Sequence, residues 1–179
     1  MVEAYKQCLW TNFGAAIDML SAAVSLCPEE LWQQRGRFYL LTYHVTIFLD
    51  YYLSIPSKDF NPMLPYTLAE SDSLPAESVD DVLPNRDYSK IELLTYIALA
   101  REKCRGLILY SQGDKLLGQW IQEDEISMHG LCPSLVSNYS VLEILFYNLR
   151  HVQHHVAQLN IILRQTINKA PDWVAHTDK

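Results

Sequence analysis

The sequence has few of the features by which proteins bind nucleic acid or build disulfide scaffolds. It carries 14 Lys and Arg against 21 Asp and Glu, for a formal net charge of −7, and its basic residues form no run. Because a phosphate backbone or an anionic membrane is bound through clustered Lys and Arg, we expect neither as a partner. The cysteines form no C-x-x-C pair and are interpreted as reduced thiols, with disulfide pairing the less favoured alternative.

Long hydrophobic runs and the common catalytic motifs are also missing. The longest strongly apolar run, FYLLTYHVTIFL, has 12 residues and is too short to cross a bilayer. The first residues lack the layout of a secretory signal peptide, so we expect a cytoplasmic protein. There is no G-x-S-x-G, no P-loop and no G-x-G-x-x-G, so any catalysis must depend on other groups.

What the sequence does contain is a helical pattern over one domain, residues 1–179. Half of the composition is apolar (49%) and 20% is charged, which suits a globular core. Helices are predicted over residues 2–26 and 36–54, after Ser89 and after Ser140, and no strand alternation is convincing. Ser89 with Glu92 and Ser140 with Glu143 match the S-x-x-E capping box. An internal duplication could also explain this similarity, but shared capping chemistry is the preferred explanation.

These helices predict an all-α, antiparallel four-helix bundle with a long loop between its second and third helices. The loop covers residues 55–87 and contains five prolines, which break helices. A connection of this length in a compact domain is usually functional or mobile.

Three of the six histidines lie within five positions of the last helix, in LRHVQHHVAQLN. An aliphatic seam runs along this helix, and a second stripe containing His151 and His155 borders the seam, while His154 points away from both. Residues four apart on a helix have β-carbons about 5–6 Å from each other. Two such imidazoles can converge on one ion, although two ligands hold a divalent metal weakly.

His44, in the middle of the second helix, is the candidate for a third ligand. Considered singly, a histidine on an apolar face is more often a satisfied core residue. Three buried imidazoles, however, would repel one another if protonated and would lack donors if neutral. A metal accepts all three lone pairs and leaves coordination positions free, as catalytic sites do. If the second helix faces away from the fourth, this hypothesis fails.

The chain resembles the DinB-like superfamily of four-helix-bundle metalloproteins, named for damage-inducible members. The residues that carry the resemblance are HVQHHVAQL in the last helix, HVTIFLDYYL in the second, the long loop between helices and the LRQ…APDWV ending. The resemblance implies an up-down-down-up bundle with His44, His151 and His155 as metal ligands and His154 as a neighbour only. Ala157 stands where many relatives have glycine. It also implies a stress-response context and a homodimer.

Three further residues are candidates for supporting the site. Asn148 and Gln158 lie on the histidine stripe and could orient a bound group or hold a ligand histidine, and Tyr51 could donate a hydrogen bond near His44. Ordinary polar or aromatic packing explains each of them at least as well. His129 and His176 are expected at the surface, and Trp173 is expected to fold back onto the bundle.

The function predicted from these residues is a metal-dependent enzyme whose ion activates a bound water or thiol. The resemblance implies thiol-dependent transfer or isomerisation on a small electrophile, with a low-molecular-weight thiol as partner. The expected ion is zinc or nickel, with manganese or iron as alternatives. The alternative function is a non-catalytic protein in which the ion only clamps two helices together. DNA binding is suggested by the family name alone and is disfavoured by the acidic charge.

Overall fold

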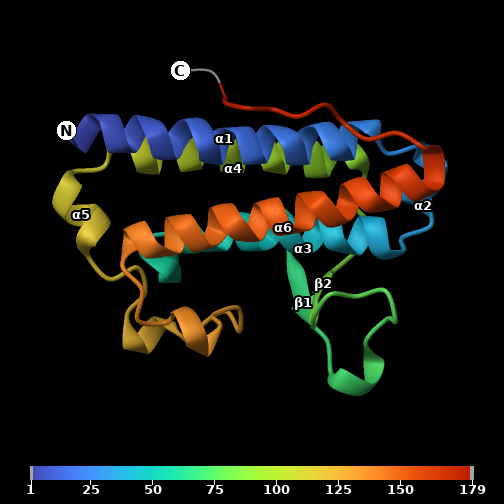
Figure 1. The fold of residues 1–179 in the computed structure, drawn as a ribbon. Helices are drawn as coiled ribbons and strands as arrows, with labels where there is room; N and C mark the ends of the chain where they lie inside the picture. The colour runs from blue at the N-terminus through green and yellow to red at the C-terminus, as the bar shows by residue number, and fades with distance from the viewer. Residues whose placement is uncertain (1, 178–179) are drawn as a thin grey trace.

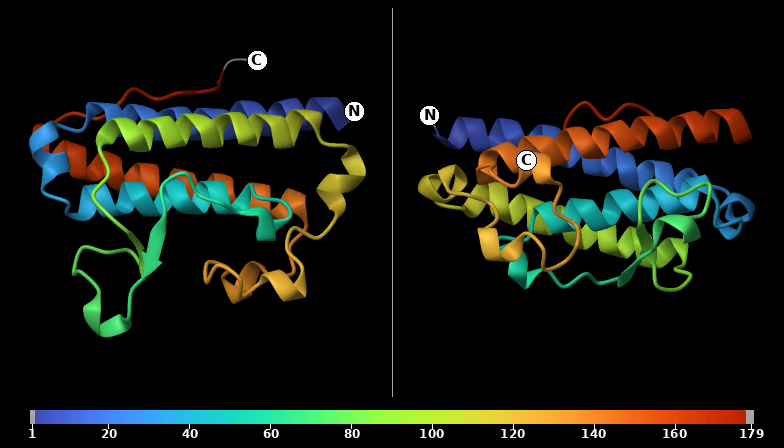
Figure 2. Two further views of the ribbon diagram at one scale, coloured as in Figure 1. Left: turned by 180° about the vertical axis from the view of Figure 1, so that it is seen from behind. Right: turned by 90° about the horizontal axis from the view of Figure 1, so that it is seen from below.

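Four long helices account for most of residues 2–177, the part of the chain that the computed structural model describes (Figure 1). They are α1 (Val2–Leu26), α3 (Arg37–Tyr52), α4 (Lys90–Tyr110) and α6 (Val141–Ile167). α1 packs against α4 and α6, and α3 packs against the same two helices, which closes a four-helix bundle. The colour gradient in Figures 1 and 2 shows α1 and α6 running in one direction and α3 and α4 in the other. The up-down-down-up bundle is therefore confirmed.

Shorter elements occupy the connections between the long helices. α2 (Glu29–Gln33) and α5 (Gly113–Leu117) are single turns, and 3₁₀ turns lie at Ser57–Asp59, Ser71–Ser73, Glu123–Glu125 and Ser134–Val136. The long loop carries a small antiparallel hairpin of β1 (Tyr66–Leu68) and β2 (Val82–Pro84), in which Thr67 pairs with Leu83. The sequence did not predict these strands, because three residues are too few to show an alternating pattern.

Both predicted capping boxes are present and fix where α4 and α6 begin. The Ser89 hydroxyl accepts a hydrogen bond from the backbone N–H of Glu92, and the Glu92 carboxylate accepts one from the Ser89 N–H at 2.8 Å. Ser140 and Glu143 repeat the arrangement at the start of α6, also at 2.8 Å. Each box satisfies two backbone donors that a helix start otherwise leaves without partners.

Helix α3 is the most enclosed of the four. Of its 16 residues, 14 are buried, because α4 and α6 cover it on two sides and the loop with the β1–β2 hairpin covers a third. Polar side chains on such a helix are costly unless they find partners. The polar groups of α3 are therefore the first place to look for a site.

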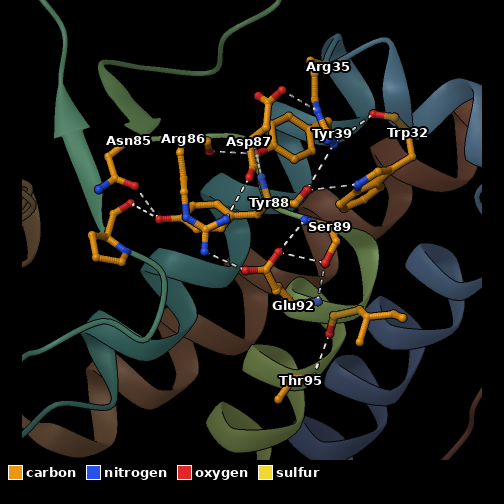
Figure 3. A network of polar contacts seen from close by, with 12 residues as sticks. Trp32, Arg35, Tyr39, Asn85, Arg86, Asp87, Tyr88, Ser89, Glu92 and Thr95 are labelled. Atoms are coloured by element: carbon orange, nitrogen blue, oxygen red, sulfur yellow. Dashed lines mark hydrogen bonds and ion pairs between the residues drawn. The ribbon is translucent and has the colours of Figure 1, made fainter.

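A polar network around Tyr88 anchors the end of the long loop (Figure 3). The Tyr88 backbone N–H donates to the Tyr39 hydroxyl at 3.0 Å, and its carbonyl accepts from Trp32 Nε1 at 3.2 Å and from Arg35 at 3.1 Å. Its ring stacks on Tyr43 of α3, with ring centroids 5.8 Å apart. The loop thus leaves the hairpin at a position fixed against both α2 and α3.

The tail after α6 returns along α1 (Figure 1). Thr177 is buried, and its backbone N–H donates to the Thr11 carbonyl at 3.1 Å. The expectation for Trp173 is wrong, since its side chain is 72% exposed. The tail is therefore held by Thr177, a residue with no large apolar group to mark it in the sequence.

Two further expectations concern the cysteines and the possibility of a membrane-spanning helix. Cys8, Cys27, Cys104 and Cys132 are free cysteines, as predicted. Within residues 2–177, no helix has the length and apolar character needed to cross a bilayer.

Candidate metal centre

The three predicted histidines converge between α3 and α6. His44 Nε2 lies 3.1 Å from His151 Nε2, and His155 Nε2 lies 3.0 Å from the same atom. One ligand atom from each ring lies within 4.8 Å of the others. The convergence follows from the fold, because α3 packs against α6 and residues four apart on α6 present their side chains on one face.

These separations suit a shared ion. Nitrogen ligands that bind one metal at about 2.0–2.1 Å are themselves about 2.9–3.5 Å apart for bond angles between roughly 90° and 120°. The separations of His151 Nε2 from His44 Nε2 and from His155 Nε2 fall in that range. The cluster is therefore a donor set that could hold a metal ion.

Gln158 fixes the protonation of His155. The His155 Nδ1 atom lies 2.8 Å from Gln158 Oε1, an acceptor, so in neutral His155 the hydrogen resides on Nδ1. The Gln158 amide nitrogen faces His154 Nε2 at 3.2 Å, which supports this orientation of the amide. The lone pair of His155 Nε2 therefore points into the cluster.

His44 has a carboxylate on its outer side. Its Nδ1 atom lies 3.0 Å from Asp80 Oδ2, a close polar contact without the directionality of a full hydrogen bond. A carboxylate accepts only, so it favours the tautomer with hydrogen on Nδ1 and the lone pair on Nε2. His151 Nδ1 is buried without a hydrogen-bond partner among the described residues.

Burial keeps the two α6 histidines neutral. Desolvation, followed by the neighbouring His44 and His155, lowers the pKa of His151 to about 2. Desolvation also lowers the pKa of His155 to about 4, although the hydrogen bond that His155 donates to Gln158 acts in the opposite direction. Neutral imidazole is the form that binds metals. When all three Nε2 atoms carry lone pairs, as binding a shared ion requires, they repel one another unless a cation lies between them.

Aromatic rings surround His151. Phe48 and Tyr52 meet it edge-on, with centroid separations of 5.8 and 6.1 Å, and the Tyr147 ring is parallel to it at 6.4 Å. His151 is half-buried and borders an open hollow of about 580 Å³ on the outer side of α6, which Arg150 and His154 also line. The cluster is thus dry on the inside and close to solvent at His151.

The residues predicted to support the site differ in whether they contact the three histidines. Gln158 contacts His155, as described above, and His154 is exposed with its Nε2 turned to Gln158. Asn148 is buried and donates to the Leu49 carbonyl at 3.0 Å, so its amide ties α6 to α3, and its Oδ1 has no partner among the described residues.

No contact joins Tyr51 to His44, His151 or His155 among the described residues. Its ring packs against Phe60, Trp120 and His129, and its buried hydroxyl has no hydrogen-bond partner among the described residues. Seven residues separate it from His44, a displacement of about 10 Å along a helix axis. Sharing a helical face with His44 was therefore not enough to place it in the site.

The histidines outside the cluster differ from each other. His176 is exposed, as expected. His129 is half-buried, contrary to expectation, because its ring packs edge-on against Phe60 and its Nε2 lies 3.1 Å from the Ser57 carbonyl.

Asp80 is the contact that the sequence analysis missed. It lies in the long loop, 36 positions after His44. The one available signal was the pair of acids, Asp80 and Asp81, near the end of that loop. The path of the loop decides which acid meets α3, and no periodicity encodes that path.

Comparisons of the chain with protein-family models, with curated proteins and with solved structures find no match. What can be said of this site therefore rests on its residues and their arrangement.

Proposed function

We propose that the protein is a DinB-like metalloenzyme that binds one divalent ion through His44, His151 and His155. The observation that carries the proposal is the approach of the three Nε2 atoms, at 3.0 and 3.1 Å, inside a largely buried layer. The tautomer that Gln158 imposes on His155 also supports it, because the free lone pair is directed into the cluster.

The proposed reaction is transfer or isomerisation that uses a low-molecular-weight thiol and a small electrophile. A divalent ion with open coordination positions lowers the pKa of a bound thiol and so supplies a thiolate near neutral pH. Gln158 and Asp80 hold the rings of His155 and His44 in the orientation that ligation needs. Phe48 and Tyr52 pack edge-on against His151, and Tyr147 lines the open hollow beside it, through which we propose that a small molecule reaches the ion.

The alternative function is a metal clamp without catalysis. One observation favours it: His44 comes from α3 and the other two ligands from α6, so a bound ion would cross-link two helices. In that case the ion contributes folding free energy and nothing else. Zinc and nickel are the ions we propose, since both suit imidazole ligands.

The test is to strip the purified protein of metal, reload it with zinc or nickel, and assay it with a panel of small thiols and one electrophile. We expect about one ion per chain and thiol consumption that depends on the ion. His155→Ala should lose both, whereas the control His176→Ala, which replaces an exposed histidine of the tail, should keep the ion.

Two outcomes count against the proposal in different ways. Unchanged metal content in His155→Ala would reject the site itself. Normal metal binding and a raised melting temperature, with no thiol consumption for any thiol of the panel, would reject the enzyme and favour the clamp.

A further inference from the structure

The carboxylate next to His44 belongs to the loop and is itself held in place. Asp80 Oδ2 lies 3.0 Å from His44 Nδ1, while Asp80 Oδ1 accepts a hydrogen bond from the backbone N–H of Val82 at 3.1 Å. One oxygen is thus used to fix the side chain against its own backbone, and the other is free to face the imidazole.

The backbone on both sides of Asp80 is fixed as well. Before it, Arg37 at the start of α3 donates to the carbonyls of Glu77 and Ser78, at 3.0 and 2.7 Å. After it, the Ala69 N–H donates to the Asp81 carbonyl at 2.8 Å, next to the paired strands β1 and β2. The loop therefore presents the carboxylate to α3 from a defined position.

A carboxylate at Nδ1 of a histidine has a known chemical consequence. It sets the tautomer, limits rotation of the ring and makes Nε2 a stronger electron donor to a metal. Among the described residues, no full hydrogen bond is made by His44 Nδ1, so the Asp80 contact is the polar interaction that orients this ring from outside the cluster, beside the packing of Phe48.

We propose that Asp80 is the positioning residue for His44, and that it couples the β1–β2 hairpin to metal binding at the three histidines. The inference rests on the proposed function, because it assigns a partner to one ligand of that site. Coupling is reciprocal: if the placed carboxylate raises metal affinity, the bound metal holds the loop in place by the same factor. This gives the long loop between α3 and α4 a role in controlling the site.

The experiment uses zinc as the probe and measures its dissociation constant by competition with a coloured chelator. Asp80→Ala should weaken zinc binding by about 10–100-fold. Asp80→Asn should fall between Asp80→Ala and the wild type, because its amide oxygen still accepts from Nδ1 but carries no charge. The matched control is Asp81→Ala, whose side chain is exposed and whose zinc affinity should stay within about twofold of the wild type.

A second measurement reports on the loop directly. Hydrogen exchange at the Ala69 amide, which reads the hairpin and not the histidines, should slow when zinc binds to the wild type. In Asp80→Ala it should no longer respond to zinc. The melting temperature of each metal-free variant shows whether the fold is intact. If Asp80→Ala does not fold, the zinc dissociation constants of Asp80→Asn and Asp81→Ala are compared instead.

The outcomes distinguish failure of the Asp80 proposal from failure of the three-histidine metal site. If the wild type binds zinc, and the Asp80 variants bind as tightly as Asp81→Ala, the inference is wrong and the three-histidine site stands. If the wild type binds neither zinc nor nickel, both are wrong.

Discussion

The bundle consists of two layers of different character, one formed by α1 and α4 and the other by α3 and α6 (Figure 1). In α1, the inward residues Phe13, Ile17 and Leu20 are fully buried and apolar. The buried charge of this helix is Lys6, which donates to the carbonyl of Ser111 just after α4 at 2.6 Å. The α1–α4 layer is thus held mainly by hydrophobic burial.

The α3–α6 layer buries polar groups instead, and most of them have ordinary partners. Asp50 is paired with Lys103 at 2.5 Å and with the Tyr96 hydroxyl at 2.7 Å, and Thr42 and Thr46 donate to carbonyls of their own helix. The three histidines differ, because their Nε2 atoms meet chiefly one another. If all three Nε2 atoms carry lone pairs, they repel one another unless a cation lies between them, and this is the reason for proposing a metal there.

The largest predicted effect is a loss of stability in the α1–α4 layer that leaves zinc binding in the α3–α6 layer unchanged. Replacing Phe13 by alanine removes a fully buried ring from the α1–α4 layer and should lower the free energy of unfolding by about 3–5 kcal/mol. Zinc affinity of the folded variant should stay unchanged, because the histidines lie in the other layer. Urea unfolding and zinc titration measure the two quantities.

The control for this prediction is Phe146→Ala, where a ring that is 51% exposed is lost and the effect on stability should stay below about 1 kcal/mol. A loss of zinc affinity in folded Phe13→Ala comparable to that of a histidine variant would show that the layers are not separate.

Acid should destabilise the metal-free protein through the α3–α6 layer. The pKa values of His151 and His155 are lowered in the folded state, to about 2 and about 4, whereas unfolded histidines titrate near 6.5. As pH falls below about 6.5, the unfolded chain takes up protons that the folded chain refuses, so stability decreases by roughly 1.4 kcal/mol per pH unit for each histidine.

Urea unfolding of chelator-treated protein between pH 7.5 and 5 measures this slope. For His155 the loss of stability should end near the folded pKa of about 4, and for His151 it should continue toward 2. The double variant His151→Gln/His155→Gln should flatten the dependence above pH 5. A stability that is constant from pH 7 to 5 in the wild type would mean that these rings are not buried as described.

The smallest effect concerns the tail on α1. A Cβ at Gly14 would lie only 2.3 Å from Thr177 Cγ2, too close to coexist, whereas a Cβ at Gly106 in α4 meets nothing within 4 Å. Gly106→Ala should therefore stabilise the protein by about 0.5–1 kcal/mol through helix propensity. Gly14→Ala should lose that gain and release the tail, which faster exchange of the Thr177 amide would reveal. Equal stabilisation by both substitutions, with slow Thr177 exchange, would exclude the tail contact.

The fold was readable from the sequence where a pattern repeats or a cap has a fixed spacing. The boxes at Ser89 and Ser140 mark the starts of α4 and α6, and the predicted ranges 2–26 and 36–54 agree closely with α1 and α3. His151 and His155 could be paired because helical periodicity fixes their separation.

The remainder depends on tertiary paths that local patterns do not encode. Asp80 contacts His44 because the loop folds back as a hairpin. Thr177 packs against α1 at Gly14, where a larger residue would place its Cβ too close to Thr177. Tyr51 was a candidate because it shares a helical face with His44. A shared face does not fix the distance between two residues along the helix axis.

X-ray absorption at the zinc edge, recorded on the zinc-loaded protein, tests the central claim most directly. We predict about three nitrogen scatterers at about 2.0–2.1 Å with the outer-shell signature of imidazole, and loss of that signature in His155→Ala. Sulfur scatterers at about 2.3 Å, or a spectrum that His155→Ala leaves unchanged, would contradict it.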